Sequence, residues 1–202
     1  MYRKILVPLD GSSLAEQILP YARLFADAYS ATVELLRVND PDIRPPFWPP
    51  LPPPDYLKQV SERYFPSSSF KVEHIEQSGK PAEVIVGRAK ADPGYLIAMT
   101  THGLSGIRRW LLGSVASKVI QSAVNPVLLI RAGEENQPAV ELSLKTVFVP
   151  LDGSALAEKI FPHIVPLAKK MKLDVNLLRV YDLPAAAFPM GEAFYLDTLA
   201  EQ

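Results

Sequence analysis

Short apolar runs alternate with amphipathic segments along most of this chain, and no other feature constrains its fold as strongly. Lys4–Leu9, KILVPL, is continuously apolar, as expected of a strand buried on both faces of a parallel sheet. The next segment has the apolar spacing of a helix, and Pro20 within it predicts a kink. Because the alternation continues, we expect an α/β fold with a doubly wound parallel sheet. Its five strands are predicted at Lys4–Leu9, Thr32–Val38, Phe70–Gln77, Tyr95–Met99 and Val127–Arg131.

The stretch Tyr95–Ser114, YLIAMTTHGLSGIRRWLLGS, is the main candidate for a binding site. A buried strand runs through a glycine-bearing loop into a helix that is expected to begin near Gly113 and Ser114. The free N–H groups and the dipole of a first helical turn favour an anion. Glycine lets the backbone approach a phosphate closely. The spacing is neither a P-loop nor a G-x-G-x-x-G fingerprint, so it predicts a phosphate site of another kind.

Two other segments are expected at the same edge of the sheet. Asp10 follows the first strand, and Val38 ends the second. Ligands of open α/β sheets bind at the carboxyl ends of the strands, near the switch in strand order. A mononucleotide would fit there. Backbone and apolar groups of the first two strands would hold its base, while Gly103, Gly113 and Ser114 face its phosphates.

The N-terminal pattern returns late in the chain. KILVPLDGSSLAE at Lys4 reappears as TVFVPLDGSALAE at Thr146, and LLRV occurs at both Leu35 and Leu177. The offset is constant, since 150 − 8 and 177 − 35 both equal 142. A constant offset indicates duplication. We expect a complete domain over residues 1–132, a polar linker over 133–144, and an incomplete second repeat over 145–202 that lacks the glycine loop.

Composition excludes several classes of function. The 202 residues carry 21 Lys+Arg against 22 Asp+Glu, a balance that argues against a nucleic-acid partner. The chain has no cysteine, so disulfides, thiol chemistry and Cys-based zinc sites are excluded. No apolar run approaches the roughly 20 residues of a membrane span, and the N-terminus does not resemble a signal peptide. We therefore expect a cytoplasmic protein without a membrane partner.

Proline is dense from Asn39 to Pro54, NDPDIRPPFWPPLPPP. Proline at this density excludes helix and internal strand and favours polyproline II. We interpret the segment as a stiff loop after the second strand. A ligand for a partner with an aromatic groove is the alternative.

Three separated motifs resemble the universal stress protein (UspA-like) family: the N-terminal KILVPLDGS, a G-(nine residues)-G-S motif, and the closing NPVLLIR. The resemblance implies a Rossmann-like sheet, of the adenine nucleotide alpha hydrolase type, with strand order 3-2-1-4-5. It also implies homodimers formed through the last strand, Val127–Arg131. ATP-binding members carry G-x-x-G-(nine)-G-[ST]. Gly103, Gly113 and Ser114 match its last three elements, and Thr100 replaces the leading glycine.

The resemblance further implies a site for ATP, with Mg²⁺ bound through the nucleotide and Asp10 as its candidate protein ligand. Val38 would meet the adenine through its backbone. The implied nucleotide-binding residues are Pro8, Leu9, Asp10, Val38, Met99, Thr100, Gly103, Gly113, Ser114 and Val115.

Three hypotheses for function stay open. The first is a universal stress protein that binds ATP, or another adenine nucleotide, as a regulatory module with little or no catalysis. The second is a dimerisation or partner-docking scaffold that has lost nucleotide binding, which Thr100 and the proline-rich segment favour. The third is a slow ATPase, ranked last because no His or Lys forms a recognisable pair with Asp10. Asp10 also has a simpler explanation, as a cap of the first helix, and the repeated Asp152 supports it.

Overall fold

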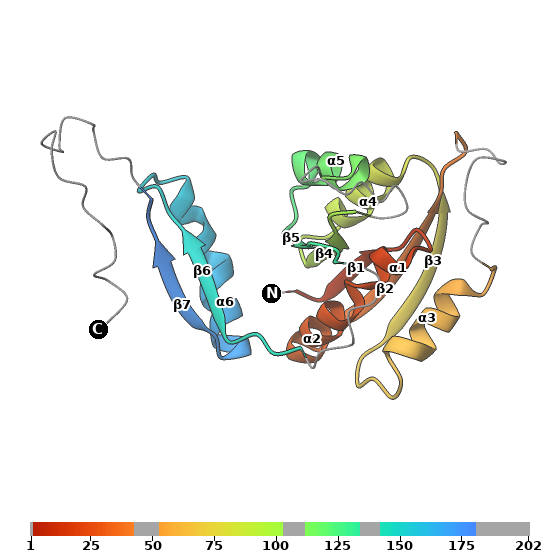
Figure 1. Cartoon of the computed structure of the whole chain (residues 1–202), viewed down its shortest axis with the longest axis horizontal. Coiled ribbons are helices and arrows are strands. Elements are labelled where there is room, and N and C mark those ends of the chain that lie inside the picture. Colours follow the sequence, from red (N-terminus) through yellow and green to blue (C-terminus); the bar gives the residue numbers. More distant parts are fainter. Residues whose placement is uncertain (1, 43–52, 103–111, 134–141, 181–202) are drawn as a thin grey trace, which may run out of the picture. The chain divides into compact units, whose positions relative to one another are not determined.

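The computed structural model describes residues 2–42, 53–102, 112–133 and 142–180 (Figure 1). The chain divides into two compact units, Met1–Ser143 and Leu144–Gln202. Gly103 and most of the proline-rich segment lie outside the described residues. In the described ranges, no helix combines the length and apolar character needed to cross a membrane.

The first unit contains a five-stranded parallel sheet in the order β3-β2-β1-β4-β5 (Figure 1). The predicted fold class and strand order are therefore confirmed. Central β1 pairs with β2 from Lys4↔Thr32 to Pro8↔Leu36, and with β4 from Lys4↔Tyr95 to Leu6↔Ile97. The strands are β1 (Lys4–Pro8), β2 (Thr32–Asn39), β3 (Val72–Ser78), β4 (Tyr95–Thr100) and β5 (Val127–Ile130).

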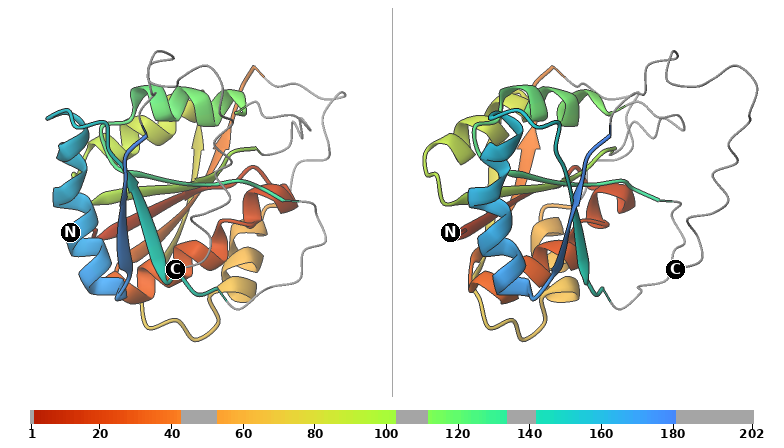
Figure 2. Two further views of the ribbon diagram at one scale, coloured as in Figure 1. Left: turned by 60° about the vertical axis from the view of Figure 1, so that its left-hand side comes forward. Right: turned by 90° about the vertical axis from the view of Figure 1, so that its left-hand side faces the viewer.

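Helices cover both faces of this sheet. One face carries α1 (Ser13–Glu16), α2 (Leu19–Tyr29) and α3 (Tyr56–Tyr64), and the other carries α4 (Pro81–Lys90) and α5 (Ser114–Ser122), as Figures 1 and 2 show. β1 and β4 are buried almost throughout because both faces are covered. β3 is an edge strand, and its polar residues are mostly exposed.

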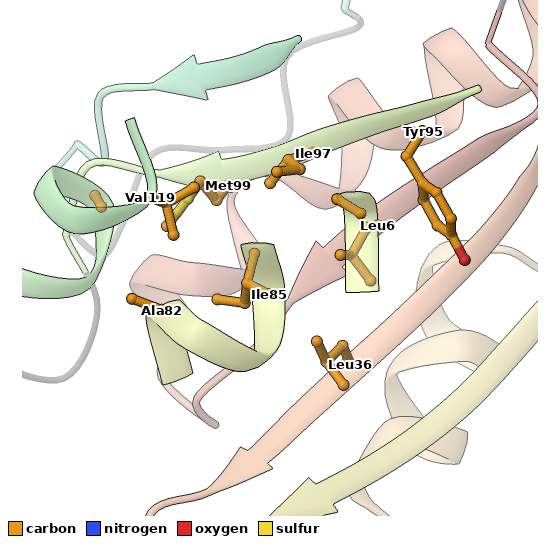
Figure 3. Packing of buried hydrophobic residues seen from close by; sticks show 10 residues of the cluster. Leu6, Leu36, Ala82, Ile85, Tyr95, Ile97, Met99 and Val119 are labelled. Atoms are coloured by element: carbon orange, nitrogen blue, oxygen red, sulfur yellow. The ribbon is translucent and has the colours of Figure 1, made fainter. Parts of the chain in front are cut away.

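The core beneath α4 and α5 is built from aliphatic side chains of the sheet and both helices. Figure 3 shows Met99 of β4 beside Val119 of α5, and Ile85 of α4 between the helix and the sheet. This packing fixes where α5 begins relative to the end of β4. The buried members of the cluster are Leu6, Leu36, Ala82, Ile85, Ala89, Tyr95, Ile97, Met99, Ala116 and Val119.

The first helical segment is interrupted, as proline predicted, although the break precedes the proline. α1 ends at Glu16, and Pro20 stands in the first turn of α2, where its missing N–H costs no helical hydrogen bond. Ser12 is the N-cap of α1, and its Oγ accepts a hydrogen bond from the backbone N of Ala15 at 3.1 Å. The simpler explanation of Asp10 as the cap is therefore wrong in detail, since the capping residue is Ser12.

The second unit contains β6 (Thr146–Pro150), a 3₁₀ turn η1 (Ala157–Ile160), α6 (Phe161–Met171) and β7 (Asp174–Leu178). β6 and β7 form a two-stranded parallel sheet with the register Thr146↔Asp174 to Pro150↔Leu178. Each of these positions is 142 above its β1–β2 counterpart. Gly11 and Gly153 have φ values of 90° and 87°, and the helix-ending Ser30 and Lys172 have 52° and 55°. The two units thus share local backbone geometry as well as sequence.

Candidate functional site

The carboxyl ends of β1, β2 and β4 meet at one edge of the five-stranded sheet. The strand order reverses between β1 and β4, and the helices that follow these two strands lie on opposite faces (Figure 1). A crevice at such a switch point is where open α/β sheets bind ligands. The predicted residues that share this edge are Pro8, Leu9, Asp10, Val38, Met99 and Thr100.

Asp10 shapes the turn between β1 and α1. Its Oδ1 accepts hydrogen bonds from the backbone N of Ser12 at 3.0 Å and from Ser12 Oγ at 2.6 Å. The second unit repeats this turn, with Asp152 accepting from the backbone N of Ser154 at 2.8 Å. Hydrogen bonds from Ser154 hold the pKa of Asp152 below its usual value. Because the turn occurs in both units, its hydrogen bonds alone do not indicate a ligand.

Apolar side chains form the floor of this edge. Leu9 and Met99 are only 3% and 6% exposed, and Met99 belongs to the core cluster shown in Figure 3. Val38 and Val115 pack against the same cluster, while Pro8 is half-buried. These side chains are therefore explained by packing. Any polar contact that these residues make with a ligand would come from their backbone atoms.

Hydrogen bonds join the two described ends of the glycine loop. The backbone N of Thr101 donates to the carbonyl O of Ile130 at 2.8 Å, which extends the β4–β5 pairing. The backbone N of Gly113 donates to the carbonyl O of Thr101 at 2.9 Å. Thr100 Oγ1 donates to the carbonyl O of His102 at 2.6 Å. The entry and exit of the loop are thus held against the end of β4.

Gly113 is the N-cap of α5, and Ser114 is the first helical residue. The helix therefore begins where the sequence predicted, at Gly113 and Ser114. A Cβ on Gly113 would lie 3.0 Å from the carbonyl O of Thr101, which is tighter than ordinary contact. Glycine is thus favoured here by the close approach of the loop's own ends. Its φ of −58° needs no glycine.

The N-terminus of α5 keeps the properties of an anion site. The backbone N of Ser117 donates to the carbonyl O of Gly113 at 2.9 Å, so Ser114, Val115 and Ala116 precede the first internal helical bond. No side-chain cap occupies this end among the described residues. Three N–H groups and the helix dipole are therefore suited to a phosphate. Ser114 is exposed and can add its hydroxyl.

The residues fit a nucleotide better than a metal bound by protein alone. Within the described ranges, no group of three or more His, Asp or Glu side chains could hold a metal ion. Mg²⁺ takes several oxygen ligands and commonly binds through substrate phosphates and one or two carboxylates. Asp10 could supply one such carboxylate once the phosphates supply the rest.

A buried charge network next to α4 was missed at the sequence level. Glu34 of β2 is 0% exposed and accepts hydrogen bonds from Lys4 Nζ at 2.7 Å, Tyr95 OH at 2.8 Å and Arg88 Nε at 2.6 Å. Burial pushes the pKa of Glu34 upward, but these three donors outweigh burial and lower it below its usual value. The carboxylate thereby ties α4 to three strands of the sheet.

A second buried carboxylate, Glu16 of α1, anchors α3. It accepts hydrogen bonds from Tyr56 OH at 3.1 Å and Tyr64 OH at 3.2 Å. Burial and the neighbouring Glu16 raise the pKa of Tyr56 far above its usual value, so its phenol stays a donor. The available sequence signal was the charge itself, because a Glu inside an apolar pattern requires partners.

The strand order β3-β2-β1-β4-β5, with a glycine-bearing loop leading from β4 to an uncapped helix N-terminus, defines a Rossmann-like α/β domain. The model of the "Universal stress protein family" matches residues 1–131. Universal stress protein MJ0531 of Methanocaldococcus jannaschii is 32% identical over 143 residues, which cover 65% of this chain and 83% of that protein. This chain therefore belongs to the universal stress protein family.

Two solved structures extend the comparison. The structure of MJ0577, a universal stress protein of the same organism, is 28% identical and has a TM-score of 0.52 over 66% of this chain and 99% of that chain. A universal stress protein from Archaeoglobus fulgidus DSM 4304 is 21% identical with a TM-score of 0.67. That match covers 90% of this chain and 68% of the other, so the likeness in fold extends beyond the first unit.

Proposed function

We propose that the first unit binds ATP, with Mg²⁺ held through the nucleotide, as a regulatory stress-response module with little or no catalysis. The observation that carries this proposal is the uncapped N-terminus of α5 at the switch-point edge of the sheet. The N–H groups of its first turn, at Ser114, Val115 and Ala116, would bind phosphate oxygens. The backbone of Val38 would meet the adenine, above an apolar floor that includes Leu9 and Met99.

The proposal of little turnover rests on the chemistry around Asp10. Its carboxylate already accepts two hydrogen bonds from Ser12, and the sequence contains no recognisable catalytic acid–base motif. Slow ATP hydrolysis remains the lesser alternative. Phosphate release by the wild type well above that of a Gly113→Asp variant would favour it.

A charge placed at the helix N-terminus tests the proposed site. Ser114→Asp puts a carboxylate where the phosphates would lie, so we expect Mg-ATP affinity, measured by calorimetry, to fall by at least about tenfold. The same carboxylate complements the helix dipole and should preserve or raise thermal stability. Unchanged affinity in Ser114→Asp would contradict the proposed site.

Ser122→Asp is the matched control for this experiment. It adds the same charge to the same helix at its other end, about 12 Å away at 1.5 Å per residue. There the charge opposes the dipole, so we expect slightly lower stability with unchanged Mg-ATP affinity. Loss of affinity in Ser122→Asp equal to that in Ser114→Asp would show that charge in general, and not position, is responsible.

We also propose a homodimer formed through strand 127–131, and this interaction underlies the scaffold alternative. β5 is an edge strand that pairs with β4, and its four residues, VLLI, are all half-buried apolar side chains without a charge to protect the edge. Leu128→Lys should convert a dimer to a monomer in light scattering. A wild type that is monomeric at all concentrations would refute the dimer.

Residues 145–202 are proposed to repeat the N-terminal part of the first unit, joined to it by a linker over residues 133–144. Support comes from the constant offset of 142 in sequence and strand register and from equal turn geometry at Gly11 and Gly153. Since the glycine motif occurs once in residues 1–202, we propose one nucleotide site within this span.

A further inference from the structure

Thr100 stands at the position that the family resemblance assigns to the leading glycine of the ATP motif, and it is the last residue of β4. Its side chain is only 6% exposed. Its Oγ1 donates to the carbonyl O of His102, two residues further on, at 2.6 Å. A hydroxyl carries a single proton. The proton of Thr100 is therefore already engaged by the backbone of the chain and is not available to a phosphate oxygen.

The residue that accepts this hydrogen bond is held a second time through its side chain. Thr101 Oγ1 lies 2.9 Å from His102 Nδ1. The backbone of Thr101 is itself fixed on both sides, by Ile130 at 2.8 Å and by Gly113 at 2.9 Å. Four hydrogen bonds thus order the entry of the glycine loop and join it to the N-cap of α5.

We propose that Thr100 is a positioning residue for the nucleotide site, whose hydroxyl orders the loop entry and thereby compensates for the missing glycine. This inference rests on the proposed function. Thr100 acts through the carbonyl of His102 and not by contact with phosphate. Its hydroxyl holds Thr101 in place, and Thr101 in turn holds Gly113 at the start of α5.

A positioning role differs measurably from a phosphate contact. If the hydroxyl only raises the fraction of protein in which the end of β4 is held against Gly113, its loss lowers the affinity for every ligand of the site by the same factor. If it contacted a phosphate, its loss would affect ATP, ADP and AMP unequally. The three nucleotides therefore separate the two roles.

The test compares Thr100→Val with Thr100→Ser in the full chain. Valine keeps the shape and removes the hydroxyl, whereas serine keeps the hydroxyl. We expect Thr100→Val to weaken the binding of Mg-ATP, Mg-ADP and AMP in calorimetry by one common factor of about tenfold, because the His102 carbonyl loses its donor. Thr100→Ser should stay within about twofold of the wild type. Wild-type affinity in Thr100→Val, a loss that differs between the nucleotides, or equal losses in both variants would overturn the proposal.

Hydrogen exchange of the Gly113 amide, measured in the absence of nucleotide, tests whether Thr100 supports the hydrogen bond between Gly113 and Thr101. This amide donates to Thr101, so it should be protected in the wild type and in Thr100→Ser. We expect its protection to fall by about tenfold in Thr100→Val. An unprotected Gly113 amide in the wild type would refute the proposal even if Thr100→Val does not fold. If the wild type binds no adenine nucleotide, the proposed function fails, while exchange still decides whether Thr100 orders the loop.

Discussion

Replacing Glu34 by Gln should destabilise the first unit more than any comparable change of a surface carboxylate. Glu34 is fully buried, and its partners come from β1, β4 and α4. Removing one partner of a buried ion pair costs about 3–5 kcal/mol. Lys4 and Arg88 are 37% and 30% exposed at their side chains, so water can solvate them in the variant. We therefore expect a loss of about 2–3 kcal/mol in the free energy of unfolding.

Urea denaturation followed by circular dichroism measures this loss. The unfolding transition whose midpoint differs between the wild type and Glu34→Gln is assigned to the first unit. Glu62→Gln is the control, because Glu62 is 67% exposed and lies 3.9 Å from Lys58 on the surface of α3. The control should change stability by less than about 0.5 kcal/mol. A change of that same small size in Glu34→Gln would refute the reasoning that this network ties α4 to the sheet.

The stability difference between the wild type and Glu34→Gln should also depend on pH. The pKa of Glu34 in the folded protein is lowered from an ordinary value of 4.5. Its contribution to stability is therefore fully present above that ordinary value and is lost as the pH falls through the lowered, folded-state pKa. The stability difference between the wild type and Glu34→Gln should be constant near neutral pH and shrink in acid. A difference that grows in acid would contradict the assignment.

Two further predictions follow from local geometry. Gly113→Ala places a Cβ against the carbonyl O of Thr101, so it should lower the midpoint of thermal unfolding and weaken Mg-ATP binding. Gly87→Ala is the control, because Gly87 lies in a helix interior with open space around the Cβ, and it should stabilise the protein by about 0.5–1 kcal/mol. A stabilising Gly113→Ala would contradict the prediction for Gly113. Ser12→Ala removes the cap of α1 and the hydrogen bond to Ala15, so a loss of about 1 kcal/mol is expected in urea denaturation, and no loss would show that the cap is not needed.

The fold could be predicted largely because its central strands are recognisable in the sequence as short apolar runs. Ile5–Leu9 and Tyr95–Met99 are apolar without interruption, and the observed β1 and β4 are buried on both faces. Strand order came from the family resemblance and was confirmed. Pro20 predicted a kink in the first helix, and the helix instead breaks between Glu16 and Leu19, so that the proline occupies the first turn of α2.

Contacts between distant segments could not be predicted. Glu34 reads as a polar position in an apolar strand until Lys4, Arg88 and Tyr95 are brought around it by the fold. The steric preference for glycine at Gly113 also could not be predicted from the sequence, because the carbonyl of Thr101 that crowds a Cβ belongs to the other end of the loop. Contacts between the two ends of a loop depend on tertiary structure, which the local sequence pattern does not encode.

Calorimetric titration of the purified 202-residue chain with Mg-ATP tests the central claim most directly. We predict saturable binding of one nucleotide per chain, because the glycine motif that leads into α5 occurs once in the sequence. Absence of binding at millimolar nucleotide would contradict the account. It would leave the uncapped N-terminus of α5 as a feature of the fold alone.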